Sequence, residues 1–325
     1  MDGAPGTDCL VVQPIAAAGI ECLRRAGLVV HVAARPDLDT LRPHLATARA
    51  VVTRNAGLSA AAIAVAPHLQ VIGSHGTGLD AIDLAAARAR GIAVVNTPGA
   101  NAQSVAELTL ALMLACATGL VAADRAVRDQ DFAWRLGGRS FELAGRRLGL
   151  VGFGAIARRV AAIARAIGME VEALSRHAEA GALAALGVAK SASLEALLES
   201  CDVVSLHGVP AVGAPLLDAA AFARMKPGAV LINTARGALV DEAALAAALV
   251  EGRLAAAGLD VFAPEPPRPG NPLFTAPNLV LSPHVGGAAR EAMERTALAV
   301  AEAVLRVLAD PAAGGAQPSS KLVTP

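Results

Sequence analysis

The chain contains the apolar run Leu148-Gly-Leu-Val151, followed directly by Gly152-Phe-Gly154-Ala-Ile-Ala157. The run predicts a β-strand, and the residues after Gly154 predict a helix over 155–166. In such a strand–turn–helix, Gly152 makes the tight turn, Gly154 lets the backbone approach a pyrophosphate, and a third small residue lets the helix pack on the strand. We therefore predict that the amides of Gly154, Ala155 and Ile156 bind a dinucleotide. The alternative is a turn with a structural role alone.

The end of the next predicted strand bears on the choice of cofactor. Proteins that prefer NAD place an Asp or Glu about 20 residues after the turn, where it accepts from the ribose 2′-hydroxyl. Here Ser175 and Arg176 occupy that position. An arginine can form a fork on a 2′-phosphate, and no carboxylate is present to repel it. We therefore favour NADP and keep NAD as the alternative, in which Arg176 is a solvated loop residue.

Short apolar runs alternate with alanine-rich helical stretches on both sides of this motif. The predicted strands are 9–12, 28–32, 50–53, 70–73 and 92–95 before it, and 170–174, 203–206, 229–233, 257–261 and 279–282 after it. This alternation predicts an α/β fold with two doubly wound parallel sheets. Thr97-Pro-Gly99 breaks the pattern before one long helix expected over 104–128, which suggests a domain crossing. Two such domains leave a cleft at the carboxyl ends of strands, where ligands usually bind.

Three motifs follow in order in the second half of the chain: Asn233-Thr-Ala-Arg236-Gly237, Gly258-Leu-Asp260-Val-Phe-Ala-Pro-Glu265-Pro266, and Ser282-Pro-His284-Val-Gly-Gly287. Each places a polar or charged side chain where an apolar strand ends and a loop begins. A guanidinium, a carboxylate and an imidazole are the groups that a carbonyl-reducing site needs. With the dinucleotide motif, they predict a dehydrogenase acting on a 2-keto or 2-hydroxy acid.

These motifs resemble the D-isomer-specific 2-hydroxyacid dehydrogenases from about Val71 to Leu308. That family includes glyoxylate and hydroxypyruvate reductases, D-lactate dehydrogenases, phosphoglycerate dehydrogenases and, more remotely, formate dehydrogenases. The resemblance implies a flavodoxin-like substrate domain made of residues 1–99 and 288–325. It also implies a central Rossmann NAD(P)-binding domain, residues 100–287, and a homodimer.

The resemblance assigns a catalytic role to one residue in each motif. Arg236 is similar to the arginine that binds the carboxylate and keto oxygen of the substrate through its planar fork. His284 is similar to the general acid that protonates the carbonyl oxygen, or the base in the oxidising direction. Glu265 is similar to the carboxylate paired with that histidine, and its charge favours the protonated imidazolium.

The resemblance also implies binding residues. Asp260 corresponds to the residue that orients the nicotinamide carboxamide, and Thr234 and Pro210 to further cofactor contacts. Gly76, Thr77 and Gly78 correspond to the loop whose backbone amides hold the substrate carboxylate. The stretch His207-Gly-Val-Pro210 departs from the family's His-x-Pro, which leaves the contacts on the adenine side open.

Composition excludes other classes of function. Lys plus Arg and Asp plus Glu both number 28, so no net charge attracts nucleic acid or an anionic membrane. The absence of Tyr and the single Trp remove the stacking surfaces of single-strand binders. The uncharged run 108–123 is shorter than the ~20 residues that span a bilayer. We expect it to form a buried helix at a domain or subunit interface.

The four cysteines, Cys9, Cys22, Cys116 and Cys201, are scattered, with no metal-ligand spacing. We therefore expect free thiols, no metal site and a cytoplasmic protein, and the first residues show no signal peptide.

The leading hypothesis is an NAD(P)-dependent 2-hydroxyacid dehydrogenase that acts on glyoxylate or hydroxypyruvate. A phosphoglycerate dehydrogenase-like activity is an alternative, which the chain length disfavours because it leaves no room for the regulatory domain that many such enzymes carry. Glu265 argues against formate oxidation, for which the family has Gln. A dinucleotide-sensing scaffold and a methyltransferase are further alternatives, but neither explains the Arg236, Glu265 and His284 set as well.

Overall fold

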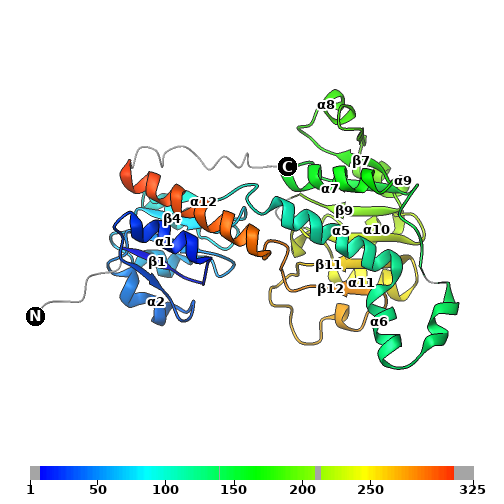
Figure 1. Ribbon diagram of the computed structural model, residues 1–325, viewed down its shortest axis with the longest axis horizontal. Coiled ribbons are helices and arrows are strands. Elements are labelled where there is room, and N and C mark those ends of the chain that lie inside the picture. The colour runs from blue at the N-terminus through cyan, green and yellow to red at the C-terminus, as the bar shows by residue number, and fades with distance from the viewer. Residues whose placement is uncertain (1–7, 139, 209–213, 311–325) are drawn as a thin grey trace, which may run out of the picture. The chain divides into compact units, whose positions relative to one another are not determined.

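The computed structural model describes residues 8–138, 140–208 and 214–310. The chain divides into two compact units. Unit 1 extends to Asn101 and resumes at Gly287, and unit 2 comprises Ala102–Gly286. Each unit is built on a parallel β-sheet of its own (Figure 1). The functional labels of the two units, as substrate and dinucleotide-binding domains, stay a prediction.

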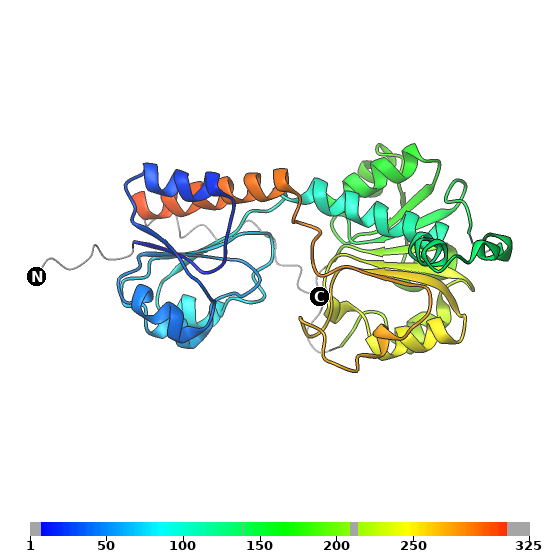
Figure 2. The same cartoon turned by 60° about the horizontal axis from the view of Figure 1, so that its bottom comes forward.

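Within its described residues, unit 1 has a five-stranded parallel sheet in the order β2-β1-β3-β4-β5. The strands are β1 (Cys9–Val11), β2 (Val30–Val32), β3 (Ala50–Thr53), β4 (Val71–Ser74) and β5 (Ala93–Val95). This is the flavodoxin-like order, which reverses between β1 and β3. Helices α1 (Ala17–Arg25) and α12 (Arg290–Ala309) pack on one face of the sheet. Helices α2 (Leu38–Leu45), α3 (Ala60–Ala64) and α4 (Leu84–Ala89) pack on the other (Figure 2).

Helix α12 joins unit 1 through two close approaches at glycines. A Cβ at Gly73, in β4, would lie 2.7 Å from Cγ2 of Val300 and 2.9 Å from Cγ2 of Val304. A Cβ at Gly19, in α1, would lie 2.6 Å from the carbonyl oxygen of Ala297. Any larger side chain would separate these elements, because interiors are close-packed. The last described helix is therefore an integral layer of the first unit.

Unit 2 has a seven-stranded parallel sheet over its described residues, in the order β12-β11-β10-β9-β6-β7-β8. Its strands are β6 (Arg147–Val151), β7 (Glu170–Leu174), β8 (Ala189–Lys190), β9 (Val203–Leu206), β10 (Ala229–Asn233), β11 (Leu254–Leu259) and β12 (Leu279–Leu281). The order reverses between β6 and β9, which is the switch point of a Rossmann-type sheet.

Helices cover both faces of the unit 2 sheet. Helices α5 (Ala102–Thr118), α7 (Ala155–Ala166) and α8 (Ala180–Ala184) contribute to one core cluster, and α9 (Leu194–Ser200), α10 (Ala219–Arg224) and α11 (Glu242–Val250) to the other. Both sheets are thus parallel and covered on two faces. The predicted class, an α/β fold with two doubly wound parallel sheets, is confirmed.

The single long helix predicted over 104–128 is wrong, because the chain breaks it at Gly119. Gly119 has φ +63°, and its α-carbon faces the indole of Trp134, 3.3 Å from a Cβ placed there. Helix α5 ends at Thr118, and α6 (Leu120–Arg128) leaves at a bend of 59°. No single helix in the described ranges is long and apolar enough to cross a membrane, and α5 and α6 reach that length only as this bent pair.

The predicted strand 257–261 also differs, because β11 begins three residues earlier and ends at Leu259. It pairs with β10 from Ala229 onward through an irregular register. Asp260 follows the strand directly and turns its side chain to the loop after β12. Other strand predictions agree closely with the structure, and those at 50–53, 170–174, 203–206 and 229–233 agree at both ends.

Candidate active site

The glycine turn after β6 has the geometry that a dinucleotide needs. Gly152 has φ +97°, and a Cβ there would lie 2.9 Å from the carbonyl carbon and oxygen of His207. A Cβ at Gly154 would have no heavy atom within 4 Å. Gly154 is also the N-cap of α7, and no side chain caps that helix end. The first amides of α7 and an open approach are the features that bind a phosphate, so these residues fit a dinucleotide.

Ser175 and Arg176 lie directly after β7, in the same sheet. The Ser175 hydroxyl accepts from the amide of Ala178 at 3.1 Å, which closes a turn. Arg176 is exposed at the tip of this turn. The residues from Ser175 to Ala178 include no carboxylate. The turn therefore presents a cation where an NAD-preferring protein would present an acid.

The stretch after β9 is described only in part, and Pro210 lies outside the described residues. His207 is described, and its Nε2 lies 2.9 Å from the Ser205 hydroxyl. Burial lowers the pKa of His207 to about 4. Its imidazole is therefore neutral at physiological pH, and it adds no charge beside the glycine turn.

The turn that carries Arg236 is shaped by the side chain of Asn233. This side chain donates to the Arg236 carbonyl oxygen at 2.8 Å and accepts from the Ala235 amide at 3.0 Å. The hydroxyl of Thr234 lies 2.9 Å from that of Thr109, in α5. A Cβ at Gly237 would lie 2.0 Å from the Phe262 carbonyl carbon. Gly237 therefore lets the turn after β10 contact the loop after β11.

His284 and Glu265 form a hydrogen-bonded pair. His284 Nδ1 lies 2.7 Å from Glu265 Oε2, and the two side chains are 36% and 32% exposed. Glu265 Oε1 also accepts from the Phe262 amide at 3.0 Å. Burial by itself would raise the pKa of Glu265, but the bonds from His284 and Phe262 and the charges of His284 and Arg236 lower it. The structure thus brings the carboxylate, the imidazole and the guanidinium into one electrostatic cluster in unit 2.

Asp260 is buried, with 1% of its surface exposed, and its carboxylate is bonded to the loop of His284. Oδ1 accepts from the Ser282 hydroxyl at 2.6 Å and the Val285 amide at 2.9 Å, and Oδ2 accepts from the Gly286 amide at 2.8 Å. From α5, the Ser104 hydroxyl donates to the Gly286 carbonyl oxygen at 2.5 Å. Sequence reasoning missed Ser104, because a serine inside a helix gives no local signal of a long-range contact.

The predicted substrate loop of unit 1 follows β4. Gly76 has φ +148°, a conformation that side chains rarely adopt. The loop's carbonyl oxygens face its own unit: that of Gly76 accepts from the Thr97 amide, that of Thr77 from the Asn96 side chain at 2.8 Å, and that of Gly78 from the Ser74 hydroxyl at 2.7 Å. The Gly76 amide donates to the Ser74 carbonyl oxygen at 2.9 Å and to the Thr97 hydroxyl at 3.0 Å. These bonds hold the loop within unit 1.

His75 and Arg54 flank this loop in unit 1. Burial, with a smaller contribution from the charge of Arg54, lowers the pKa of His75 to about 4. Within the described part of the chain, His75 Nε2 is buried and has no hydrogen-bond partner. The Arg54 guanidinium donates to the Pro14 carbonyl oxygen at 3.1 Å, and burial lowers its pKa. Unit 1 therefore offers one partly buried cation and one neutral imidazole beside the loop.

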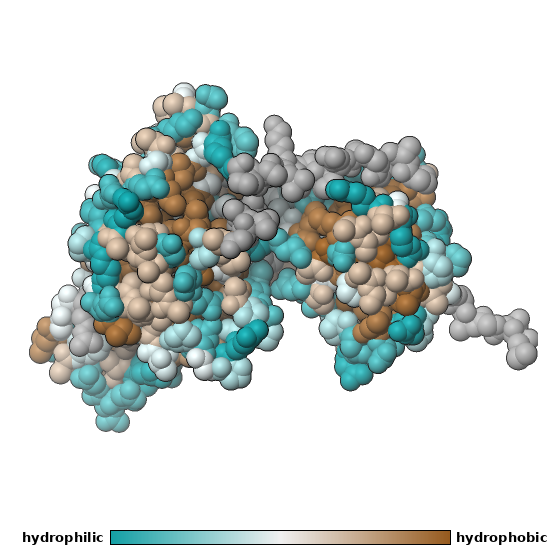
Figure 3. All heavy atoms as spheres, turned by 180° about the vertical axis from the view of Figure 1, so that it is seen from behind, coloured by the Kyte–Doolittle hydropathy of each residue, from teal (hydrophilic) through white to brown (hydrophobic). Residues whose placement is uncertain are grey.

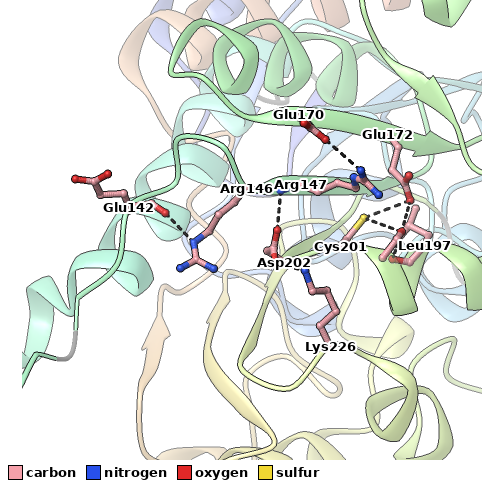
Figure 4. A network of polar contacts seen from close by, with 10 residues as sticks. Glu142, Arg146, Arg147, Glu170, Glu172, Leu197, Cys201, Asp202 and Lys226 are labelled. Carbon is pink, nitrogen blue, oxygen red and sulfur yellow. Dashed lines mark hydrogen bonds and ion pairs between the residues drawn. The ribbon is translucent and has the colours of Figure 1, made fainter.

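The amino edge of the unit 2 sheet carries a separate polar network (Figure 4). Arg147 pairs with Glu170 at 3.2 Å, and Lys226 pairs with Asp202. The Cys201 thiol donates to Glu172 at 3.3 Å, and burial raises its pKa to about 12. A thiol that stays protonated is a poor nucleophile. No group of three or more His, Cys, Asp or Glu side chains in the described residues could hold a metal ion.

A Rossmann-type unit whose strand ends carry a Glu–His pair beside an arginine defines a class of dinucleotide-dependent proteins. The family model described as "D-isomer specific 2-hydroxyacid dehydrogenase, NAD binding domain" matches residues 110–286. The chain is 42% identical to a glyoxylate reductase of Aeropyrum pernix, over 73% of this chain and 72% of that protein. It therefore belongs to the D-isomer-specific 2-hydroxyacid dehydrogenase family.

Two further similarities extend over most of the chain. A D-3-phosphoglycerate dehydrogenase of Archaeoglobus fulgidus is 37% identical over 92% of this chain, but the match covers 56% of that protein. The chain thus spans about half the length of the curated phosphoglycerate dehydrogenases that it matches. The structure of an NADPH-dependent glyoxylate/hydroxypyruvate reductase from Sinorhizobium meliloti superposes with a TM-score of 0.81 at 29% identity, covering 94% of this chain and 95% of that one.

Proposed function

We propose that this protein is an NAD(P)-dependent 2-hydroxyacid dehydrogenase, which transfers a hydride between a nicotinamide cofactor and a small 2-keto or 2-hydroxy acid. The observation that carries the proposal is the hydrogen bond between His284 Nδ1 and Glu265 Oε2, with the Arg236 charge acting on the same carboxylate. Family membership and the glyoxylate reductase relative support it. A scaffold that only senses dinucleotides would have no use for such a pair.

In this proposal His284 donates the proton to the carbonyl oxygen. Because Nδ1 is engaged by Glu265, Nε2 is the ring nitrogen left to face the substrate. The lowered pKa of Glu265 keeps this carboxylate ionised at neutral pH, so that it accepts the hydrogen bond from Nδ1 of His284. His284 is thus oriented for proton donation in the reductive direction, and a nicotinamide cofactor would, when bound, supply the hydride for the carbonyl carbon.

Arg236 anchors the substrate. Its planar guanidinium can bind a carboxylate and a keto oxygen in one fork, which polarises the carbonyl. In unit 1, the carbonyl oxygens of Gly76, Thr77 and Gly78 are bonded within that unit. The Gly76 amide also donates within the unit, to the Ser74 carbonyl oxygen and the Thr97 hydroxyl. We infer that the backbone amides of Thr77 and Gly78 serve as the donors to the substrate carboxylate.

We infer NADP as the favoured cofactor, with NAD as the alternative. In this proposal the pyrophosphate is held by the glycine turn and the start of α7, at Gly152, Gly154, Ala155 and Ile156. The 2′-phosphate is held by Ser175 and Arg176. The exposed arginine and the acid-free turn after β7 support this choice. The NADPH dependence of the Sinorhizobium meliloti reductase is consistent with it. Thr234 and Asp260 remain proposed cofactor contacts, although the hydroxyl of Thr234 already bonds Thr109.

We infer glyoxylate or hydroxypyruvate as the substrate, as in the names of two of the proteins that this chain resembles. One observation favours a phosphoglycerate dehydrogenase-like activity as a second candidate. Arg54 is a partly buried cation beside the Gly76 loop, and it would attract a second anionic group on a larger substrate.

We also infer a homodimer that forms through α6 and the 3₁₀ helix η1 (Phe132–Gly137). Apolar side chains on these two elements are more than half exposed: Leu120, Val121, Val127, Phe132 and Leu136. In Figure 3 apolar atoms reach the surface in this corner of unit 2, at the lower left of the view. An isologous contact would bury this same apolar patch on each of two copies. The four cysteines lie in described segments and form no disulfide, which supports a cytoplasmic location.

A substrate panel tests the reaction and the cofactor together. Glyoxylate, hydroxypyruvate and 3-phosphohydroxypyruvate are each assayed with NADPH and with NADH. We expect turnover of at least one 2-keto acid, with a lower KM for NADPH than for NADH. Absence of turnover with every pair would contradict the proposed function.

The Arg176→Ala variant tests the reading of the 2′-phosphate. We expect it to raise the KM for NADPH about 10- to 100-fold and the KM for NADH less than about twofold, because one charge-assisted fork is lost. His177→Ala, in the same loop, is the matched control and should leave both values close to those of the unaltered protein. Equal effects of Arg176→Ala on the two cofactors would show that Arg176 does not distinguish them.

A further inference from the structure

Asp260 is bonded to nearly every donor of the loop that carries His284. The Ser282 hydroxyl and the amides of Val285 and Gly286 donate to its carboxylate. The His284 amide donates to its backbone carbonyl oxygen at 2.8 Å. Pro283, the remaining residue of the loop, has no amide hydrogen. One buried residue therefore accepts four hydrogen bonds from this loop.

The loop needs such fixing because His284 has φ +53°. The backbone of any residue other than glycine is strained in this left-handed region, so the surrounding contacts must hold His284 there. The loop also packs closely on Asp260 at Gly286, where an added Cβ would lie 3.0 Å from Asp260 Oδ2. The backbone conformation of His284 sets the direction of its imidazole toward Glu265.

The carboxylate has little remaining capacity for a ligand. An ionised carboxylate has about four lone-pair positions, and the loop occupies three of them. Oδ1 accepts two hydrogen bonds, and Oδ2 accepts one from the Gly286 amide. Asp260 itself is only 1% exposed. These contacts direct the charge of Asp260 to the His284 loop.

We propose that Asp260 is a positioning residue that acts through His284, by holding residues 282–286 in the conformation that aims the imidazole at Glu265. This inference rests on the proposed function, in which His284 is the proton donor. It adds to Asp260 a role in the alignment of the acid, and the lone-pair position that the loop leaves open is the one for the proposed cofactor contact. Ser282 and Ser104 are the auxiliary contacts that fix the two ends of the same loop.

Asp260→Asn tests the proposal, because the amide group places a donor against the donors of the loop. We expect kcat to fall about a hundredfold through misalignment, while the KM and the Kd for NADPH stay within about threefold. Ser282→Ala removes one donor, leaves the carboxylate intact and should lower kcat in the same direction by a smaller factor. Ser282→Thr keeps the hydroxyl and should restore the activity, which keeps the test valid if Asp260→Asn does not fold.

The His284 ring gives a readout that needs no substrate. We expect the NMR chemical shifts of its ring protons, measured in the unliganded protein at one fixed pH, to change in Asp260→Asn and Ser282→Ala, because the contact with Glu265 is altered. This measurement separates the two proposals: a panel with no turnover contradicts the proposed function, whereas unchanged His284 ring shifts contradict the positioning role. A tenfold or larger loss of NADPH affinity in Asp260→Asn with unchanged His284 ring shifts would assign Asp260 to the cofactor alone.

Discussion

His284 combines a left-handed backbone with a side chain that has to meet a carboxylate 2.7 Å away. The strain of such a residue is of order 1–3 kcal/mol. Hydrogen bonds contribute about 1 kcal/mol each, and more when one partner is charged. The bonds from the loop to Asp260 are therefore sufficient to offset this strain.

We predict that His284→Gln lowers kcat about 10²- to 10⁴-fold, because glutamine keeps a polar side chain but cannot act as a general acid. The affinity for NADPH, measured by the fluorescence of the cofactor, should change less than about twofold. His68→Gln, an exposed residue of unit 1, is the control and should retain full activity. Turnover of His284→Gln within about tenfold of the unaltered protein would rule out the acid role.

The residues of the site differ in how far sequence could predict them. The sequence motifs contain Arg236, Glu265 and His284 and predict that the three side chains lie close together. The structure shows a hydrogen bond between His284 and Glu265, and the charge of Arg236 acts on Glu265. Ser104 is 182 residues from its partner Gly286 and has no motif. The left-handed φ of His284 was equally hidden, because no rule assigns that conformation to a histidine before Val-Gly-Gly.

Helix α7 and strand β7 show where local pattern is sufficient to define an element. Their bounds, Ala155–Ala166 and Glu170–Leu174, agree with the prediction. Glycines lie at both ends of the helix, and the polar residues that start at Ser175 end the strand. The helix predicted over 104–128 failed because a single glycine costs a helix only about 1 kcal/mol, so the sequence does not by itself require a break. In the structure the break coincides with the close approach of Gly119 to the Trp134 indole, which the local sequence does not reveal.

Helix α6 and η1 carry the proposed interface, and we predict that two charges placed there dissociate the dimer. Val121→Glu with Phe132→Glu should convert a dimer to a monomer in sedimentation velocity, because these exposed apolar side chains would be buried between two copies. The fold of each protomer should be retained, so the melting temperature of the double variant should stay close to that of the unaltered protein.

Val250→Glu, on α11, is the matched control for this pair, because it adds a charge at a side chain that is 69% exposed outside the patch. It should leave the sedimentation coefficient unchanged. A monomeric unaltered chain, or a double variant that remains a dimer, would contradict the proposed interface.

At the scale of the whole molecule, we predict that stability decreases as the pH falls from about 6.5 to 4. Burial lowers the pKa of both His75 and His207 to about 4, so the unfolded chain binds more protons than the folded one across this window. Each histidine should contribute roughly 1–3 kcal/mol of stability above pH 6.5 that is lost toward pH 4. Glu265, with its lowered pKa, extends the loss to lower pH.

Urea unfolding at pH 7.5 and pH 5 measures this dependence. His207→Asn should reduce the difference between the two pH values, since asparagine can still bond Ser205 but does not titrate. The control His68→Asn, at an exposed position, should leave the difference unchanged. Equal free energies of unfolding at both pH values for the unaltered protein would disprove the prediction.

The architecture was more predictable than its connections. Alternation of strand and helix patterns predicts two parallel sheets, because each buried strand and each amphipathic helix has its own period. The order β2-β1-β3-β4-β5 and the layer formed by α12 depend on contacts such as Gly73 with Val300, which link residues over 200 positions apart. Only the family resemblance, and no local pattern, pointed to that return of the chain.

The position of α12 has a consequence for synthesis on the ribosome. One face of the unit 1 sheet, with Val11, Val52 and Val71, packs against Val300 and Val304. A nascent chain that already contains this sheet therefore exposes an apolar face until residues 290–309 leave the exit tunnel. Unit 2, which is continuous in sequence, can complete its own core earlier. Translation thus imposes an order in which the unit begun first is the one finished last, and its uncovered sheet is the surface that a chaperone would protect.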